Sequence, residues 1–269
     1  MTKDIALVYM VAGISRRFGG KIKGLTEIMQ GKTLIDISLQ QAVPAGFSKI
    51  VFITGEQTRG PFEEHFGSSY RGLPVFYALQ TYDSALRDKP WGTADAICSA
   101  REFLNCPFVV CNGDDLYGSR AFQVLASHLS DSKDAAAIGY RLYDNVPEVG
   151  GVNRATFTLD GEEYVKDIKE TTNIMRSSIS EMGLSVDDLC SMNIFALPLE
   201  VLALLEERVR LFKKSHEGNR TAECYLPTEL SILISQGLRM KLYSSHEACT
   251  GITNPGDEEI VRKELAKGI

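Results

Sequence analysis

No stretch of this sequence is apolar over the roughly 18 to 20 residues that a membrane-spanning helix needs. Low-complexity segments and internal repeats are also lacking. Positive charge is not in excess, since 29 lysines and arginines stand against 35 acids and the net charge is −6. Nucleic acids and membrane surfaces select basic faces, so neither is an expected partner. The first residues lead into a predicted strand instead of a cleavable signal, and we expect a cytoplasmic protein.

The six cysteines show no C-x-x-C spacing, and several lie in apolar runs. This pattern favours reduced thiols in a core over a disulfide framework or a zinc site. None of the four histidines lies in a recognisable motif. The spacings therefore give no support for a Ser/His/Asp or Cys/His catalytic arrangement.

Short apolar runs alternate with amphipathic segments over the first half of the chain. Strands are predicted at Ile5–Val11, Lys49–Gly55, Pro74–Leu79 and Pro107–Cys111, and helices at Thr33–Ala42, Phe62–Phe66 and Thr93–Leu104. This alternation predicts an α/β fold, a Rossmann-like domain whose mostly parallel, mixed sheet is covered by helices on both faces.

The second half changes pattern. Asp160-Gly161 separates two strand-like runs, Val152–Leu159 and Tyr164–Ile168, which predicts a small β-hairpin. Further strands are predicted at 134–142, 191–197 and 239–243, and helices at 199–212, 223–235 and 255–266. No linker is evident, so we predict one domain, 1–269, with a nucleotide-binding half at about 1–118 and an acceptor-binding half at about 119–269.

Residues 11–23 carry three glycines and four cations directly after the first apolar run. The glycines are Gly13, Gly19 and Gly20, and the cations are Arg16, Arg17, Lys21 and Lys23. Glycine lets backbone N–H groups approach an anion, and lysine and arginine pair with polyphosphates. We interpret this stretch as a phosphate-binding loop, and a solvated basic turn is the alternative.

Two common phosphate motifs do not fit. A Walker A loop needs glycine where Thr26 stands, so Gly31-Lys32-Thr33 is better explained as a turn that opens the next helix. The dinucleotide fingerprint fails because Ser15 and Phe18 occupy two of its glycine positions.

The predicted fourth strand ends in the adjacent acids Asp114 and Asp115. Ligands of open parallel sheets bind beyond the carboxyl ends of the strands, where the cationic loop also falls. Carboxylate oxygens suit Mg²⁺ that carries triphosphate oxygens, so we predict a magnesium site there. An Asp-rich turn that caps the following helix is the alternative.

Three motifs, in the same order, resemble those of the sugar-1-phosphate nucleotidyltransferases, which join a nucleoside triphosphate to a phosphorylated small molecule. They are Ala12-Gly13-Ile14-Ser15-Arg16-Arg17-Phe18 with Lys23, then Pro90-Trp91-Gly92-Thr93-Ala94, and then Asp114-Asp115-Leu116-Tyr117-Gly118. The resemblance covers most of the chain. It implies a nucleotidyltransferase with Mg²⁺ as cofactor and no protein nucleophile.

The resemblance also implies roles for single residues. Arg17, Lys23 and Asp114 would be catalytic, and the nucleotide would contact Ala12, Gly13, Ser15, Arg17, Gln80, Gly92 and Thr93. The acceptor would contact Gly151, Glu170 and Asn193. The metal would be held by Asp114 and Asp115, with Thr253, Asn254 and Asp257 near the last strand.

The chain departs from the family pattern at two of these places. Thr253 stands where the family's second metal ligand is an acid or asparagine, and Thr171 replaces a lysine that follows the acceptor-half glutamate. The acceptor therefore need not be a familiar hexose phosphate. Alternatives are a phosphocholine-type cytidylyltransferase, a molybdenum-cofactor guanylyltransferase, a glycosyltransferase and a catalytically silent nucleotide-sugar sensor. The base, the acceptor and the oligomeric state stay open, a homodimer being one alternative.

Overall fold

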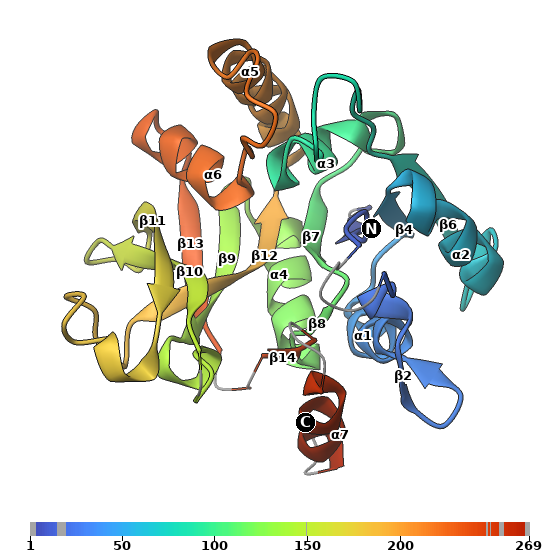
Figure 1. Ribbon diagram of the computed structural model, residues 1–269, viewed down its shortest axis with the longest axis horizontal. Helices are drawn as coiled ribbons and strands as arrows, with labels where there is room; N and C mark the ends of the chain where they lie inside the picture. Colours follow the sequence, from blue (N-terminus) through green and yellow to red (C-terminus); the bar gives the residue numbers. More distant parts are fainter. Residues whose placement is uncertain are drawn as a thin grey trace.

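The computed structural model describes residues 4–14, 20–148, 150–245, 247, 249–252 and 256–266. Within these residues, ten strands form one mixed sheet in the order β11–β10–β12–β7–β1–β4–β6–β5, and β9 and β13 extend it from β12 (Figure 1). These strands are β1 (Ala6–Met10), β4 (Lys49–Thr54), β5 (Ser69–Tyr70), β6 (Leu73–Leu79), β7 (Phe108–Asn112), β9 (Ala135–Arg141), β10 (Val152–Leu159), β11 (Val165–Ile174), β12 (Leu189–Leu197) and β13 (Met240–Ser244).

The centre of the sheet is parallel. β1 lies between β4 and β7, with Val8 opposite both Val51 and Val110. All three valines are buried, as expected for strands that are covered on both faces. The left part of the sheet in Figure 1 is mostly antiparallel and contains the predicted hairpin, β10–β11. The predicted α/β fold class is confirmed.

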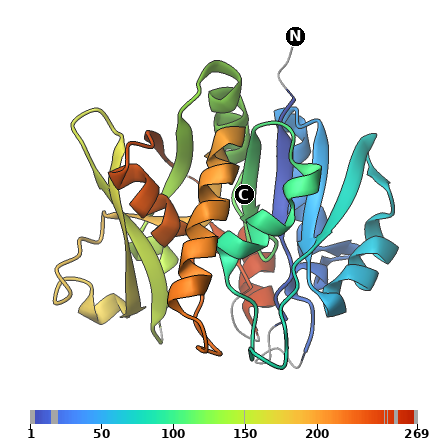
Figure 2. The same cartoon turned by 90° about the horizontal axis from the view of Figure 1, so that it is seen from above.

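Helices cover both faces of the sheet, as Figure 2 shows. They are α1 (Leu34–Ala42), α2 (Glu56–Phe66) and α4 (Ser119–Asp131) on one face, and α3 (Thr93–Ser99), α5 (Leu199–Ser215) and α6 (Leu226–Ser235) on the other. Leu39 and Phe122 pack in the first core, and Ile97, Leu202 and Leu230 in the second. Each helix therefore buries one apolar stripe against the sheet.

Most predicted element boundaries hold to within a few residues, and α2 and α3 differ clearly. α2 begins at Glu56, six residues earlier than predicted. The apolar pattern did not reveal its first turns because these carry mostly polar residues. α3 ends at Ser99 and gives way to a short 3₁₀ helix at Arg101–Phe103. The predicted turn before α1 is confirmed, since the Thr33 hydroxyl accepts from the Asp36 N–H in a capping box.

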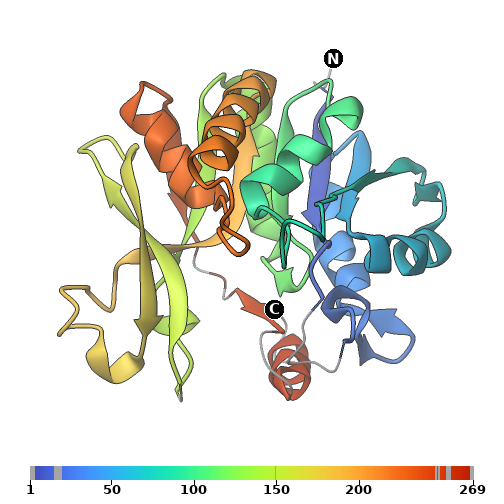
Figure 3. The same cartoon turned by 45° about the horizontal axis from the view of Figure 1, so that its top comes forward.

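The C-terminal segment leaves the main sheet and returns to the N-terminal half of the chain (Figure 3). β14 (Thr250–Gly251) pairs with β8 (Asp115–Leu116), and α7 (Asp257–Ala266) packs Val261 into a small core with Ile28. Two further short strands, β2 (Glu27–Met29) and β3 (Lys32–Thr33), form the hairpin that α7 contacts. The end of the chain thus comes to lie beside the predicted metal ligands.

None of the helices in the described part of the chain is long and apolar enough to cross a membrane. Five of the six cysteines are buried and Cys98 is half-buried. Burial raises the pKa of the Cys111 and Cys249 thiols well above their usual value, which makes these thiols unreactive. The predicted core location of the cysteines is confirmed.

Candidate active site

The loop after β1 and the loop after β7 meet at Lys23 and Asp114. The Lys23 Nζ lies 3.2 Å from the Asp114 Oδ2, and both side chains are partly exposed. Glycine makes this approach possible, because a Cβ added at Gly24 would lie only 2.8 Å from the Gly113 carbonyl oxygen. The predicted meeting of a cation from the first loop with an acid from the fourth predicted strand is therefore present in the structure.

Asp115 lies beneath this contact, in a buried polar network. Its Oδ2 accepts from the Asn112 Nδ2 at 2.9 Å and lies 3.4 Å from the Tyr117 hydroxyl. The Tyr117 hydroxyl also donates to the Met192 carbonyl at 2.8 Å and so links the β7 loop to β12. Burial, and then the charge of Asp114, raise the pKa of Asp115 to about 7. Two neighbouring carboxylates, of which Asp115 is buried, form a place where a cation is favoured.

The last strand lies directly against this acidic pair. Gly251 is opposite Asp115 in β14–β8, and the Ile252 N–H donates to the Asp114 carbonyl at 3.0 Å. A Cβ added at Gly251 would lie 2.1 Å from the Asp115 Oδ1, so a side chain there would displace the carboxylate.

Three metal ligands were also predicted beyond this strand. Thr253 and Asn254 lie outside the described residues. Asp257 begins α7 and lines neither of the two cavities described below.

Asp114 and Asp115 are the described residues that we consider as ligands of a metal ion. Within the described residues, no group of three histidine, cysteine or acidic side chains gathers in a way that could hold a metal ion. Magnesium, however, commonly takes one or two carboxylates and fills its remaining positions with water and substrate phosphate oxygens. The two aspartates fit such an ion and do not fit a site made of protein ligands alone.

The first cavity, of about 630 Å³, lies at the carboxyl ends of β1, β4 and β6. Predicted residues Ala12, Gly13 and Gln80 line it, together with Lys89 and Pro90 of the following turn. A Cβ added at Gly13 would meet no atom within 4 Å, so the backbone there faces open space. Predicted residues Ser15 and Arg17 fall in the same loop but lie outside the described residues.

Gln80 is buried, and its side-chain NH₂ group is directed away from the cavity. Its Nε2 donates to the Asp95 Oδ2 at 2.8 Å and to the Gly92 carbonyl at 3.0 Å. Asp95 is held in turn by the Lys213 Nζ at 2.5 Å. A carboxylate can only accept, so it determines which end of the Gln80 amide faces it.

The second cavity, of about 380 Å³, opens where β12 changes partners. β12 pairs with β10 at Ser191 and with β7 from Phe195 onward, and Asn193 between them adopts a left-handed φ of +58°. Predicted residues Lys23, Asp114, Asp115, Glu170 and Asn193 all line this cavity. The structure therefore brings Lys23 and Asp114 together with Glu170 and Asn193, although these residues come from four separate parts of the chain.

Three predicted residues occupy other positions. Thr93 lines the second cavity instead of the first, and its hydroxyl accepts from the Leu226 N–H at 2.9 Å. Gly92 lines neither cavity but packs against Cys224, whose carbonyl oxygen would lie 2.6 Å from an added Cβ. Gly151 also lines neither, and it packs against the Asn173 side chain. The two glycines thus serve close packing in this structure.

Sequence reasoning missed Arg154, which lines the second cavity from β10. Its Nε donates to the Asn145 carbonyl at 3.2 Å, and among the described residues no carboxylate lies within ion-pair distance of it. Arg154 lies opposite Thr171 in the β10–β11 register, the position where the resemblance leads one to expect a lysine. A cation is therefore present at that level of the hairpin, on the neighbouring strand. No sequence signal marks it, because strand pairing is needed to see it.

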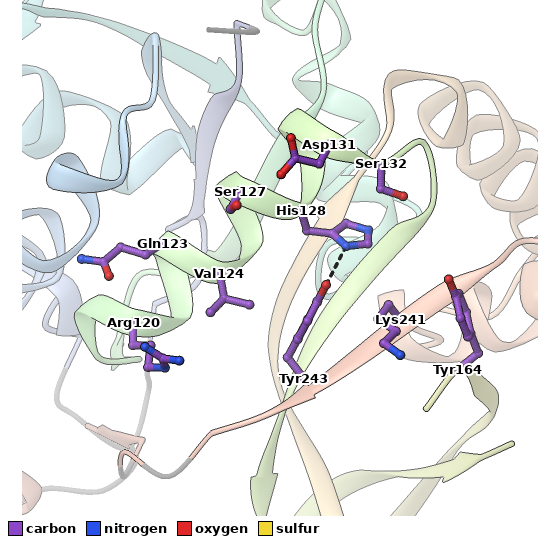
Figure 4. Close-up of a pocket in the computed structure, with 10 residues that line it drawn as sticks. All are labelled: Arg120, Gln123, Val124, Ser127, His128, Asp131, Ser132, Tyr164, Lys241 and Tyr243. Carbon is purple, nitrogen blue, oxygen red and sulfur yellow. Dashed lines mark hydrogen bonds between the residues drawn. The ribbon is translucent and has the colours of Figure 1, made fainter. Parts of the chain in front are cut away.

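A third hollow, of about 550 Å³, lies between α4 and β13 (Figure 4). Several of its polar groups have hydrogen-bond partners within the protein. His128 lies 3.0 Å from the Tyr243 hydroxyl through Nδ1 and 3.0 Å from the Asp134 carbonyl through Nε2, and Lys241 donates to the Glu162 carbonyl. None of the predicted site residues lines it, so we do not assign the chemistry to this hollow.

Comparison with known proteins identifies the class. The sequence model of the nucleotidyl transferase family matches residues 20–217, so the chain belongs to this family. The UTP–glucose-1-phosphate uridylyltransferase AglF of Haloferax volcanii is 27% identical over 116 residues, which are 43% of this chain and 44% of that protein. The bifunctional protein GlmU of Staphylococcus carnosus is 23% identical over 246 residues, 89% of this chain and 47% of that protein. The match thus spans less than half the length of both curated relatives.

A solved structure of UDP-glucose pyrophosphorylase complexed with UDP-glucose has the same fold. It superposes with a TM-score of 0.70 at 16% identity, covering 99% of this chain and 100% of that one. The family membership that the three motifs predicted is confirmed.

Proposed function

We propose that the protein joins a nucleoside triphosphate to a sugar 1-phosphate, or to a similar phosphorylated acceptor, and releases pyrophosphate. The observation that carries this proposal is the Lys23–Asp114 contact. The loop that bears Lys23 also borders the first cavity through Ala12 and Gly13, and Asp114 lines the second. Family membership supports the proposal, as does the uridylyltransferase activity on glucose 1-phosphate in the name of one relative.

The reaction needs orientation and charge stabilisation more than proton transfer. An oxygen of the acceptor phosphate attacks the α-phosphorus, the bond from that phosphorus to the bridging oxygen breaks, and pyrophosphate leaves with the electron pair. A phosphate monoester has its second pKa near 6, so the nucleophile is already largely a dianion at neutral pH. No histidine or protein nucleophile is required, and neither a histidine nor a cysteine is among the described residues that line the second cavity.

Lys23 would hold the transferring phosphoryl group, since its side chain lines the second cavity and its loop borders the first through Ala12 and Gly13. Backbone N–H groups at Ala12 and Gly13 would face the triphosphate, because Gly13 leaves that side of the loop open. Arg17 stays a predicted partner of the same phosphates. These groups would bring two anions together and stabilise the charge that develops on the leaving pyrophosphate.

Magnesium is proposed as the cofactor, held by Asp114 and Asp115. When bound, it would supply a charge that neutralises phosphate oxygens and fixes their direction. Burial, and then the neighbouring charge of Asp114, raise the pKa of Asp115, and a bound cation would favour its charged form, which supports this assignment.

The acceptor is proposed to lie in the second cavity, against Glu170 and Asn193. Burial raises the pKa of Glu170, while the nearby charge of Arg154 lowers it. A half-buried carboxylate and an amide suit hydroxyl groups of a sugar or another polyol. Arg154 supplies the cation at the level of Thr171, so the missing lysine does not leave this end of the cavity without positive charge.

The test is a binding screen followed by an assay. Thermal unfolding is measured with UTP, CTP, GTP, dTTP and ATP, each with and without Mg²⁺. The stabilising triphosphates are then combined with glucose 1-phosphate, other hexose 1-phosphates and phosphocholine, and pyrophosphate is measured. Pyrophosphate release that needs both substrates is the expected result. Binding of a nucleotide sugar with no pyrophosphate exchange would instead indicate a regulator, and absence of any nucleotide binding would contradict the proposal.

A further inference from the structure

Two segments that are far apart in the sequence form walls of different cavities and lie against each other. The turn segment, residues 82–92, borders the first cavity through Tyr82, Asp88 and Lys89. The crossing loop, residues 219–227, borders the second cavity through Tyr225 and Pro227. Any contact between the turn segment and the crossing loop therefore joins the walls of the two cavities.

Arg87 is the central contact between them. Its side chain is only 4% exposed, and its guanidinium donates to backbone carbonyls on both segments. Nε donates to the Lys89 carbonyl at 3.1 Å, Nη1 to the Asn219 carbonyl at 2.7 Å and Nη2 to the Ala222 carbonyl at 2.5 Å. Its carbon Cζ lies 3.4 Å from the centre of the Trp91 ring.

This environment is unusual for a buried charge. Among the described residues, no carboxylate pairs with Arg87, so carbonyl dipoles and the Trp91 ring alone compensate the charge. A buried charge is costly unless it is fully hydrogen-bonded, and a guanidinium can satisfy several carbonyls at once because it offers five N–H groups in one plane. A residue of any other type at position 87 could not hold both segments in this way.

Backbone contacts extend the junction towards the reactive centre. The Cys224 N–H donates to the Trp91 carbonyl at 2.6 Å, and the Cys224 carbonyl accepts from the Ala94 N–H at 3.0 Å. Gly92, with a φ of +100°, has no side chain that could separate the two segments. The start of α3 is thereby fixed to the crossing loop just before Tyr225 reaches the second cavity.

We propose that Arg87 is a positioning residue that couples nucleotide binding to acceptor binding by fixing the turn segment to the crossing loop. This inference rests on the proposed function. Arg87 contacts no predicted reacting group, so its loss should change the placement of both substrates more than the chemical step. The two Michaelis constants should rise together, and kcat should fall less.

The test uses the full-length protein with Arg87→Met, which keeps the apolar stem and removes the donors. With UTP and glucose 1-phosphate, or the pair found most active in the screen, we expect both KM values to rise by about tenfold, the effect of losing charged hydrogen bonds. UTP affinity is also measured by calorimetry in Mg²⁺ with and without non-hydrolysable acceptor analogue. The change in affinity that the acceptor analogue causes in the wild type should be lost in the variant.

Arg262→Met is the matched control. Arg262 also donates to backbone carbonyls of a distant segment, at Ile28 and Glu27, but lines neither cavity. The Arg262→Met substitution should lower thermal stability, and it should leave both KM values and the effect of the acceptor analogue on UTP affinity unchanged. A merely structural Arg87 would behave in the same way, with less folded enzyme and wild-type KM values, and that result would overturn the inference.

The remaining outcomes are also decisive. If Arg87→Met does not fold, Arg87→Lys is tested instead, since lysine keeps the charge but donates from a single point. The expected result is again a rise in both KM values and loss of the acceptor analogue's effect on UTP affinity. A change in only one KM contradicts coupling. Should the wild type bind no triphosphate and release no pyrophosphate, the proposed function fails and this inference fails with it. An active wild type with an unaffected Arg87→Met variant removes the positioning role alone.

Discussion

The two halves of the molecule form their cavities in different ways. In the N-terminal half, parallel strands β1, β4 and β6 end at one edge, and the loop of Ala12 and Gly13 borders the cavity beyond them together with side chains such as Gln80. In the acceptor half, the cavity is a gap in a mostly antiparallel region, where β12 leaves β10 and joins β7. Charged and amide side chains, among them Glu170 and Arg154, border it.

From this difference we expect the loop of Ala12 and Gly13 to bind any nucleoside triphosphate, and the second cavity to select the acceptor. Backbone N–H groups recognise phosphate charge, which every nucleoside triphosphate carries. Side chains with defined donors and acceptors distinguish one acceptor from another. Asp114 and Lys23 line the second cavity, and the loop of Lys23 also borders the first, so changes at these two residues should affect both substrates. Changes at residues confined to one cavity should affect one substrate.

The largest effect is expected from Asp114→Asn, at the junction of the two halves. The variant keeps the shape of the side chain but loses the charge, so pyrophosphate release should fall at least about a hundredfold, as for loss of a metal ligand. Thermal unfolding should show an intact fold. Asp131→Asn, an exposed acid at the end of α4, is the control and should keep full activity. Full activity of Asp114→Asn would refute its catalytic role.

A second prediction concerns the glycine that lets the two loops meet. In Gly24→Ala, the new Cβ would lie 2.8 Å from the Gly113 carbonyl oxygen and should separate Lys23 from Asp114. We expect kcat/KM to fall roughly thirtyfold, which corresponds to a loss of about 2 kcal/mol of transition-state stabilisation. Gly60→Ala is the matched control, because Gly60 lies in α2 with nothing within 4 Å of its added Cβ. Equal activities of the two variants would show that the close approach is not needed.

A third prediction affects the nucleotide half alone. Gly13→Ala should fold normally, since no atom of the residues that the structure describes lies within 4 Å of the added Cβ. The methyl group would occupy space that the triphosphate needs, so the KM for the nucleotide should rise by about tenfold. The KM for the acceptor should not change. Equal increases in both KM values would contradict the separation of the two cavities.

The smallest effect is expected from Glu170→Gln, in the acceptor half. The amide keeps the size of the side chain but loses the charge that holds acceptor hydroxyls, so the KM for the acceptor should rise about fivefold. The KM for the nucleotide should stay constant in initial-rate measurements. Glu162→Gln, in the exposed hairpin turn, serves as the control. An unchanged acceptor KM would place the acceptor elsewhere.

Residue pattern was sufficient for the strands of the parallel core, because a strand buried on both faces is apolar throughout, as Ile5–Val11 is. The helix that Thr33 caps was also predictable, since its capping residues are neighbours in the sequence. The length of α2 was not, because its first turns carry few apolar residues.

The candidate site was predictable only in part. Asp114, Lys23 and Glu170 could be named from motifs, and the structure brings them to one cavity. Arg154 and Arg87 could not, because their significance depends on a strand register and on carbonyls more than a hundred residues away. Gly92 matched a motif, but its close packing against Cys224 shows only in three dimensions.

By itself, the sequence determined that this protein is an α/β protein in which the loops after the first and fourth predicted strands carry opposite charges, because local apolar periodicity and short motifs are properties of neighbouring residues. Only the tertiary structure decided that Lys23 contacts Asp114, that β12 opens a second cavity and that Arg87 joins the walls of both. These arrangements depend on loop approach, strand register and long-range hydrogen bonds, which arise when distant segments pack and which leave no local trace in the chain.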